Sequence, residues 1–199
     1  MKNSATAVRD GVRLPHLSGP AAGIRQAIAA HFLVGCPHII EIGGAGLPIS
    51  RFVTHHPESV TVIDPKIEPL ATEELNGFPC RLRHIAAKFQ DHEAVAVEMP
   101  AFEPGTYGLA LLGLSLKPRG SHPALDDDLL ALAAGARTIV IDYALQLGRA
   151  NEQIPTLLNL ERHDIVVDMN MRLNDASLAD SPFRDRRLIV LSSQERDGA

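Results

Sequence analysis

Residues 38–48 hold the feature that most restricts how this chain can fold. They read His-Ile-Ile-Glu-Ile-Gly-Gly-Ala-Gly-Leu-Pro, an apolar run that contains one acid and breaks into a glycine-rich turn. A short apolar run bounded by glycines is typical of a buried strand. Pro48 suits a first helical turn, because its missing N–H has no partner there in any case. The stretch therefore predicts a strand, a tight turn and a helix that begins near residue 48.

A second strand signal completes this unit. Residues 60–63 are Val-Thr-Val-Ile, and Asp64 follows them directly. In a strand–helix–strand unit of about 20 residues, first-turn glycines let backbone N–H groups approach a ligand closely. An acid at the tip of the second strand accepts hydrogen bonds from ribose hydroxyls. The spacing of Gly43 and Asp64 therefore predicts a nucleoside-binding unit.

The glycine spacing distinguishes between nucleoside cofactors. From Gly44 the chain reads Gly-Ala-Gly-Leu-Pro-Ile, so the third glycine of the dinucleotide fingerprint G-x-G-x-x-G is missing. That glycine permits close helix–strand packing near a pyrophosphate. Its absence argues against NAD or FAD as the cofactor.

Two short segments resemble motifs of the class I S-adenosylmethionine (SAM) methyltransferase superfamily. Glu41, two residues before the first glycine, and the turn after it resemble motif I, and Val-Ile-Asp at 62–64 resembles motif II. This resemblance implies a Rossmann-like fold and SAM as cofactor, with the glycine turn around its methionine end and Asp64 on its ribose. Ligands of open α/β sheets lie beyond the carboxyl ends of the strands. Residues at the ends of the other parallel strands are therefore also expected to contact the cofactor. The expected cofactor-binding residues are Glu41, Gly43, Gly44, Ala45, Gly46, Asp64, Pro65, Ala87, Gly113 and Leu114.

The motif departs from the superfamily pattern at three places. Against E-x-G-x-G-x-G, alanine and leucine stand at the two later glycine positions. The acid that commonly pairs with the adenine amine is missing after the third strand, where residues 85–88 read Ile-Ala-Ala-Lys. Backbone groups or Asp91 are the candidates for that role. The Gly-Leu-Pro turn also resembles that of nicotianamine synthases, which transfer the aminocarboxypropyl arm of SAM.

The pattern along the rest of the chain predicts an α/β fold. Strands are expected at 38–42, 59–63, 81–85, 107–112, 138–143, 165–167 and 188–191. Helices are expected over 20–35, 48–55, 89–97, 149–161 and a stretch after Asp126-Asp127-Asp128 that Gly135 caps, with a loop and a short helix over 65–74. This order predicts a three-layer sandwich with a mostly parallel seven-strand sheet that ends in an antiparallel strand pair. Residues 1–19 are expected to be a flexible arm, and 20–199 one SAM-binding domain.

Composition restricts the partners. Acidic residues outnumber basic ones by 24 to 19, which argues against a nucleic-acid footprint. The densest basic cluster, Arg184-Asp185-Arg186-Arg187, is interpreted as the solvated entry of a strand. No apolar run is long enough to span a membrane, and no signal core precedes the domain. The sequence predicts a cytoplasmic protein with a small-molecule substrate, and a homodimer is compatible with it.

Residues that could carry chemistry are few. The spacing of metal ligands is found neither in the pair Cys36 and Cys80 nor in the pair His55-His56. The three acids at 126–128 suit the positive end of a helix dipole better than a metal site. No metal is therefore expected. The candidates for a substrate-side base are Tyr143, Asp142, His84 and Ser115, and for each of them a structural role is the favoured interpretation.

Methyl transfer from an activated sulfonium needs mainly alignment and exclusion of water, so a missing acid–base motif does not exclude activity. The first hypothesis is thus a SAM-dependent methyltransferase acting on a small molecule. The second is an aminocarboxypropyl transferase or cyclase that releases methylthioadenosine. The third is a SAM-fold binding or regulatory subunit without catalysis.

Overall fold

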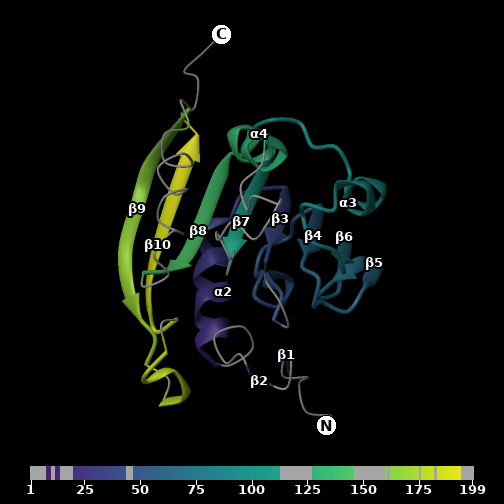
Figure 1. Cartoon of the computed structure of the whole chain (residues 1–199). Coiled ribbons are helices and arrows are strands. Elements are labelled where there is room, and N and C mark those ends of the chain that lie inside the picture. Colours follow the sequence, from purple (N-terminus) through teal and green to yellow (C-terminus); the bar gives the residue numbers. More distant parts are fainter. Residues whose placement is uncertain are drawn as a thin grey trace.

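An eight-stranded mixed sheet forms the centre of the protein, in the strand order β5-β6-β4-β3-β7-β8-β10-β9 (Figure 1). The computed structural model describes residues 8–9, 12–13, 20–43, 47–112, 127–145, 160, 162–174, 176–181 and 183–193. The strands are β1 (Val8–Arg9), β2 (Val12–Arg13), β3 (His38–Ile42), β4 (Ser59–Ile63), β5 (Leu70–Leu75), β6 (Phe78–Ile85), β7 (Tyr107–Leu112), β8 (Thr138–Ala144), β9 (His163–Arg172) and β10 (Asp185–Ser193). The helices are α2 (Pro20–Phe32), α3 (His92–Glu98) and α4 (Asp127–Gly135), with 3-10 turns η1 (Ile49–Arg51) and η2 (Ala176–Leu178).

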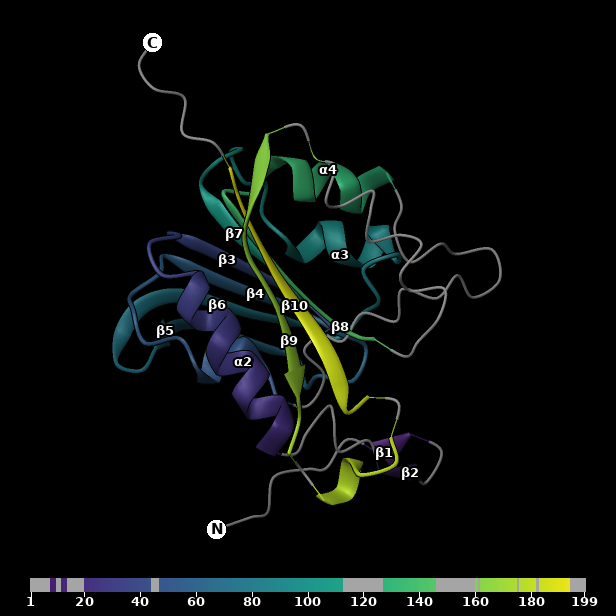
Figure 2. The ribbon, with the colours of Figure 1, turned by 90° about the vertical axis from the view of Figure 1, so that its left-hand side faces the viewer.

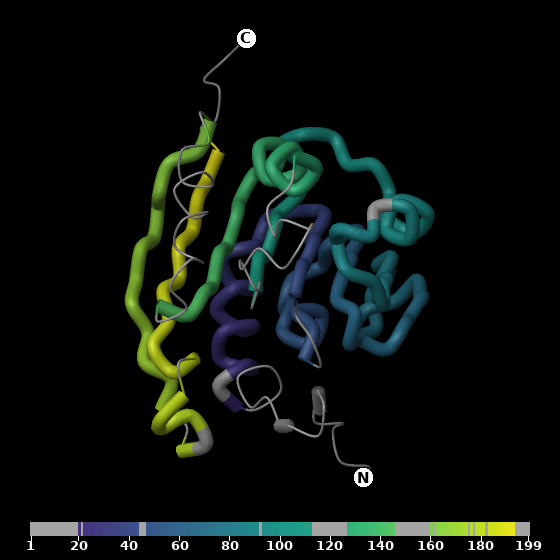
Figure 3. The backbone as a smooth tube through the Cα atoms, in the orientation of Figure 1, coloured from purple at the N-terminus to yellow at the C-terminus, as the bar shows by residue number. Residues whose placement is uncertain are grey.

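The five central strands are parallel, and the chain reverses its direction of travel across the sheet between β3 and β7. From β3 the chain adds β4 and then β6 on one side, and it later adds β7 and β8 on the other (Figure 3). β10 lies antiparallel between β8 and β9. In parallel sheets a ligand crevice opens at such a reversal, beyond the carboxyl ends of the strands.

Helices cover both faces of the sheet, which gives three layers (Figure 2). α2 and η1 pack on one face, where alternate residues such as Ile39, Val140 and Leu188 form one apolar cluster. α3 and α4 pack on the other face, against a second cluster that includes Ile40, Leu109 and Ile141. Because successive side chains of a strand point to opposite faces, each buried strand supplies both clusters. Within the described residues, every helix is too short or too polar to cross a bilayer.

The seven strands expected from the sequence are all present, and the three-layer α/β architecture is confirmed. The antiparallel pair at the end of the sheet is β9 and β10. The helix expected over 149–161 falls almost wholly outside the described residues. In the expected N-terminal arm, the described residues form a two-residue antiparallel pair of β1 and β2. The division into an arm and one domain stays a prediction.

Of the loop and short helix expected over 65–74, the loop is present over 65–69, but the helix is wrong. This stretch holds β5, an edge strand that pairs antiparallel with β6 through a two-residue turn at Asn76-Gly77. Both turn residues have positive φ, 53° and 85°. Asn-Gly is the preferred pair for such a turn, because it tolerates left-handed backbone at both positions. This hairpin adds an eighth strand to the seven expected.

The helix expected over 48–55 is also wrong. Only η1 forms there, and the backbone leaves helical geometry after Phe52. The following residues are β-branched Val53 and Thr54, and Pro57 disfavours helical backbone at the residue before it. Over 48–55 the chain therefore forms one short 3-10 turn instead of a helix.

Gly108 in β7 lies directly against the segment that follows α2. A Cβ atom placed there would lie 2.6 Å from Leu33 Cδ2 and 3.0 Å from Cys36 Sγ. Gly23 in α2 differs, because a Cβ atom there would meet only Phe52 and Leu47 at 3.5 Å or more. The two glycines are therefore a matched pair for testing this packing.

We expect Gly108→Ala to lower the free energy of unfolding by about 1–3 kcal/mol, because overpacking forces Leu33 and Cys36 to shift. Gly23→Ala should leave it unchanged or raise it by up to about 1 kcal/mol, since alanine favours helix interiors. Urea denaturation of both variants checks this. Equal stability of the two variants would contradict the close packing of Leu33 and Cys36 on β7.

Candidate functional site

The carboxyl edge of the parallel strands gathers the residues that the sequence singles out. The structure describes Glu41, Gly43, Asp64, Pro65, Ala87, His84, Asp142 and Tyr143. Gly44, Ala45, Gly46, Gly113, Leu114 and Ser115 lie outside the described residues. Among the residues described, no cluster of three or more His, Cys, Asp or Glu side chains is placed to hold a metal ion.

Gly43 opens the turn at the end of β3. Its φ is 93°, a conformation that favours glycine, and its N–H donates to the Ile63 carbonyl at 3.0 Å. This bond carries the β3–β4 pairing one residue beyond the strand. The start of the turn is thus held directly beside the end of β4.

Asp64 stands at the end of β4, beside Gly43. Its N–H donates to the Ile85 carbonyl at 3.1 Å, and its Oδ1 accepts the Lys66 N–H at 2.8 Å. The side chain is fixed at the edge of the sheet and is 7% exposed. Pro65 next to it is exposed. Ala87, beyond β6, is half-buried, and its N–H also donates to the Ile85 carbonyl at 2.9 Å.

Glu41 joins three elements through its carboxylate. Gln26 Nε2 of α2 donates to Oε1, and the Ile49 N–H of η1 donates to Oε2, both at 2.7 Å. The residue is completely buried. Because β3 and η1 flank the glycine turn, Glu41 holds the two ends of the turn together. It is a positioning residue for the turn.

The pKa of Glu41 is raised to about 7. Burial is the main cause, and the nearby Asp64 carboxylate adds to the rise. The hydrogen bonds from Ile49 and Gln26, together with the charge of Arg25, oppose it only in part. Glu41 therefore exchanges its proton near neutral pH.

His84 and Ser50 lie on the α2 face near the end of β6, with His84 Nε2 and Ser50 Oγ 3.3 Å apart. Both side chains are buried. Burial lowers the pKa of His84, and the charge of Arg51 lowers it further. The imidazole is thus neutral at physiological pH.

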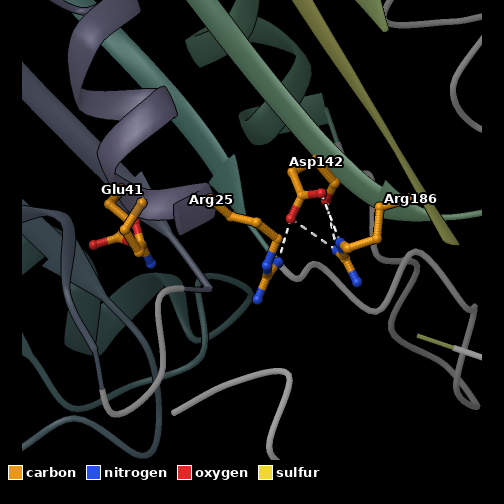
Figure 4. A network of polar contacts seen from close by, with 5 residues as sticks. Arg25, Glu41, Asp142 and Arg186 are labelled. Carbon is orange, nitrogen blue, oxygen red and sulfur yellow. Dashed lines mark hydrogen bonds and ion pairs between the residues drawn. The ribbon is translucent and has the colours of Figure 1, made fainter. Parts of the chain in front are cut away.

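Asp142 lies inside β8 and forms the centre of a buried ion cluster (Figure 4). Arg186 of β10 donates from Nε to Oδ1 at 2.7 Å and from Nη2 to Oδ2 at 2.8 Å. Arg25 of α2 donates from Nη1 to Oδ2. Burial alone would raise the pKa of Asp142, but the two arginines outweigh it and lower the pKa. A carboxylate held in this way is a weak base.

Tyr143 points to the opposite face of the sheet from Asp142, because neighbouring strand residues alternate. It packs in the cluster under α3 and α4, and Arg187 Nη1 lies 3.4 Å from its hydroxyl. The three described candidates for a base therefore do not lie together. His84 and Asp142 are on the α2 face of the sheet, with the three strands β4, β3 and β7 between them, and Tyr143 is on the opposite face.

The interpretation of residues 184–187 as a solvated strand entry is wrong for Arg186, which is 1% exposed. Arg187, on the other face, is half-buried and pairs with Asp168, with Nε and Oδ1 2.7 Å apart. The signal in the sequence was alternation: Arg186 shares its face with Leu188 and Val190. Asp142 stands inside an apolar run, and this indicated that a buried acid needs a buried cationic partner such as Arg186.

No protein-family model matches the chain, and no curated protein matches it in sequence. Solved structures do match. The N-methyltransferase NodS from Bradyrhizobium japonicum, in complex with S-adenosyl-L-homocysteine (SAH), superposes with a TM-score of 0.56 at 15% identity, over 92% of each chain. The chain shares its fold. A 1,6-didemethyltoxoflavin N1-methyltransferase from Burkholderia thailandensis, with its substrate and SAH bound, gives 0.55 at 15% identity, over 89% of this chain and 80% of the other. The 23S rRNA methyltransferase ErmE gives 0.52 at 16% identity, over 85% and 67%.

Replacing Glu41 by glutamine tests the buried carboxyl. The folded pKa of Glu41, about 7, lies above its ordinary value of 4.5, so the folded state binds the proton more tightly than the unfolded state. The contribution of Glu41 to stability is therefore complete below pH 4.5 and is lost as the pH rises through 7. At about 1.4 kcal/mol per pKa unit, the loss is about 3 kcal/mol.

We expect Glu41→Gln to become more stable relative to the original protein as the pH rises from 5 to 8, because glutamine does not ionise. Asp142 titrates in both proteins, so its effect cancels in the difference. Urea denaturation at pH 5, 6, 7 and 8 measures it. Parallel pH profiles of the two proteins would show that Glu41 titrates normally.

Proposed function

We propose that this protein is a SAM-dependent methyltransferase that acts on a small molecule. The observation that supports this best is the pairing of two neighbouring strand ends at the reversal of the sheet. There Gly43 begins a turn that requires positive φ, and Asp64 presents a fixed carboxylate at the end of the next strand. The fold around this pair is shared with N-methyltransferases whose structures contain SAH or a bound substrate.

The residues fit the chemistry of the cofactor. A carboxylate at the position of Asp64 accepts hydrogen bonds from two ribose hydroxyls, and a glycine turn exposes backbone N–H groups. SAM supplies a methyl group already activated on a sulfonium. The protein has to align the acceptor with that methyl and exclude water. Glu41 serves alignment by holding the ends of the glycine turn, through Gln26 and Ile49.

A small-molecule acceptor is favoured over RNA, although the similar structures include a 23S rRNA methyltransferase. The net charge of the chain is −5. A protein that binds the phosphates of RNA needs a basic surface to neutralise them. We further propose a reducing, cytoplasmic setting, because Cys36 and Cys80 are both buried free thiols. The assembly state stays a prediction.

We expect SAH to bind and to raise the melting temperature. A ligand at 100 times its Kd stabilises a protein by about 2.7 kcal/mol. Thermal unfolding with SAH, SAM and NAD provides the measurement. A rise with NAD and none with SAM or SAH would contradict the cofactor assignment.

Chromatography of SAM incubated with the protein identifies the reaction. SAH that forms only when a cell extract supplies an acceptor supports methyl transfer. Methylthioadenosine formed by the protein alone, above the spontaneous rate, would instead establish aminocarboxypropyl chemistry or cyclisation. Tight SAM binding with neither product would favour a binding or regulatory subunit.

Asp64→Ala should weaken SAH binding at least tenfold, because it removes charge-assisted hydrogen bonds worth about 1.5–3 kcal/mol each. Asp64→Asn is the matched variant, since its amide oxygen can still accept the Lys66 N–H and preserve the local turn. Isothermal titration of SAH compares the two with the original protein. If Asp64→Ala binds SAH as tightly as the original protein, the end of β4 does not hold the ribose.

A further inference from the structure

A cavity of 270 Å³ opens at the amino edge of the parallel strands, at the opposite end of the strands from Gly43 and Asp64. Its lining includes the first residues of β3 and β4 and the segment 100–103, which connects α3 to β7 over the upper end of the sheet (Figure 1). Because the five residues of β3 rise about 3.3 Å each, about 16 Å separates the two edges. The volume lies just below the usual range for small-molecule sites, about 300–1,000 Å³, and suits a compact ligand.

Four residues form a row across this edge of the sheet. The register pairs are Arg81 of β6 with Ser59 of β4, Ser59 with His38 of β3, and His38 with Tyr107 of β7. Register partners in neighbouring strands point to the same face, so this row lies on the α3 face, where Tyr107 is buried. At about 4.8 Å per strand spacing, the row spans about 14 Å.

Phe102 forms an aromatic wall beside the row. Its ring is tilted against the ring of His38, with centroids 5.2 Å apart, and against the ring of Tyr107, with centroids 5.7 Å apart. His38 is held in turn by Ser59, with Nδ1 and Oγ 3.0 Å apart. An aliphatic chain packs well on such a ring, and a cation is attracted to its face.

One end of the row presents a cation and an anion next to each other. The Arg81 N–H donates to the Glu58 carbonyl at 2.9 Å, so these two exposed side chains start from adjacent positions. Glu73 lies within electrostatic range of Arg81, but its carboxylate is bound to Arg83. Among the described residues, the Arg81 guanidinium makes no hydrogen bond or ion pair. A neighbouring guanidinium and carboxylate can bind the carboxylate and the ammonium group of one α-amino acid.

A second carboxylate lies at the other end, next to the aromatic wall. Glu103 follows Phe102 and is exposed, and Thr106 Oγ1 donates to the Glu103 carbonyl at 2.7 Å. Within the described part of the chain, the Glu103 carboxylate makes no hydrogen bond or ion pair. His38 aside, the charged residues of the lining are two acids and one arginine, a net charge of −1. A ligand with a net charge of +1 matches this lining.

We propose that this cavity binds a basic α-amino acid, one with a second ammonium group at the end of an aliphatic side chain. Arg81 binds the α-carboxylate, because a guanidinium matches carboxylate geometry. Glu58 binds the α-ammonium group, and Glu103 binds the terminal ammonium group. The aliphatic stem packs on Phe102. This site goes beyond the proposed function, because it lies at the edge of the sheet opposite Gly43 and Asp64.

L-Lysine, L-norleucine and cadaverine form a series for the test. All three share the aliphatic stem, but L-norleucine lacks the terminal ammonium group and cadaverine lacks the carboxylate. NMR titration of the nitrogen-labelled protein reports both the affinity and the place of binding. We expect L-lysine to shift the amide signals of His38, Ser59 and Arg81 saturably, and to leave those of Gly43 and Asp64 unchanged.

L-Norleucine and cadaverine should each bind at least about threefold more weakly than L-lysine, because each loses one charged contact at an exposed site. Equal binding of the three compounds would overturn the proposal. So would the absence of saturable shifts at the amino edge.

Arg81→Met and Glu103→Gln test the two ends of the cavity. Arg81→Met should weaken L-lysine binding at least about threefold and leave cadaverine binding unchanged, because cadaverine has no carboxylate. Glu103→Gln should weaken L-lysine binding similarly and leave L-norleucine binding unchanged. Arg83→Met and Glu98→Gln are the matched controls, since each removes one charge outside the cavity, and both should bind L-lysine as tightly as the original protein.

If Arg81→Met or Glu103→Gln binds L-lysine as tightly as its control does, the inference is wrong. The NMR spectrum of each variant also reports whether the variant is folded. The series of three compounds tests the proposal on the original protein, so it decides the matter even where a variant fails to fold.

Discussion

The glycine turn depends on a buried carboxylate that spans it. Glu41 precedes the turn and Ile49 follows it, and one carboxylate joins them while Gln26 anchors the other oxygen to α2. At the start of the loop, the Gly43 N–H donates to the Ile63 carbonyl, and past its end Ile49 packs in the apolar cluster on the sheet. A fully buried acid is costly, and the raised pKa of Glu41 reflects this cost. The fold thus accepts an unfavourable burial, which fixes η1 against the end of β3 at the carboxyl edge of the parallel strands.

Much of the sheet follows from patterns that are local in the sequence. β3, β4, β7 and β8 are predominantly apolar, as parallel strands buried on both faces require. The position of Asp64 beside Gly43 follows from parallel pairing of adjacent strands. For these elements the sequence was sufficient, because burial on both sides leaves few alternatives.

Elsewhere the outcome depended on weak local signals or on partners that are distant in the sequence. The charged residues of β5 conceal its strand character, and the Asn76-Gly77 turn was the stronger signal. η1 stops after one turn because the residues beyond it disfavour helix. Alternation with Leu188 and Val190 indicates that Arg186 faces inward, but its ion-pair partner could not be predicted from its own neighbours. Its partner Asp142 is 44 residues away in the sequence, and only the antiparallel register of β10 with β8 brings them together.

The insertion of β10 between β8 and β9 also sets an order for assembly. During synthesis β8 and β9 emerge first, yet they do not pair with each other, so the edge of β8 stays open until β10 arrives. Until then Asp142 has only Arg25 as a cationic partner within the cluster. Arg186, the second cation of the cluster, is therefore added late, when the nascent chain closes its sheet. A chain that stops short of β10 would retain Gly43 and Asp64 but would leave Asp142 without Arg186.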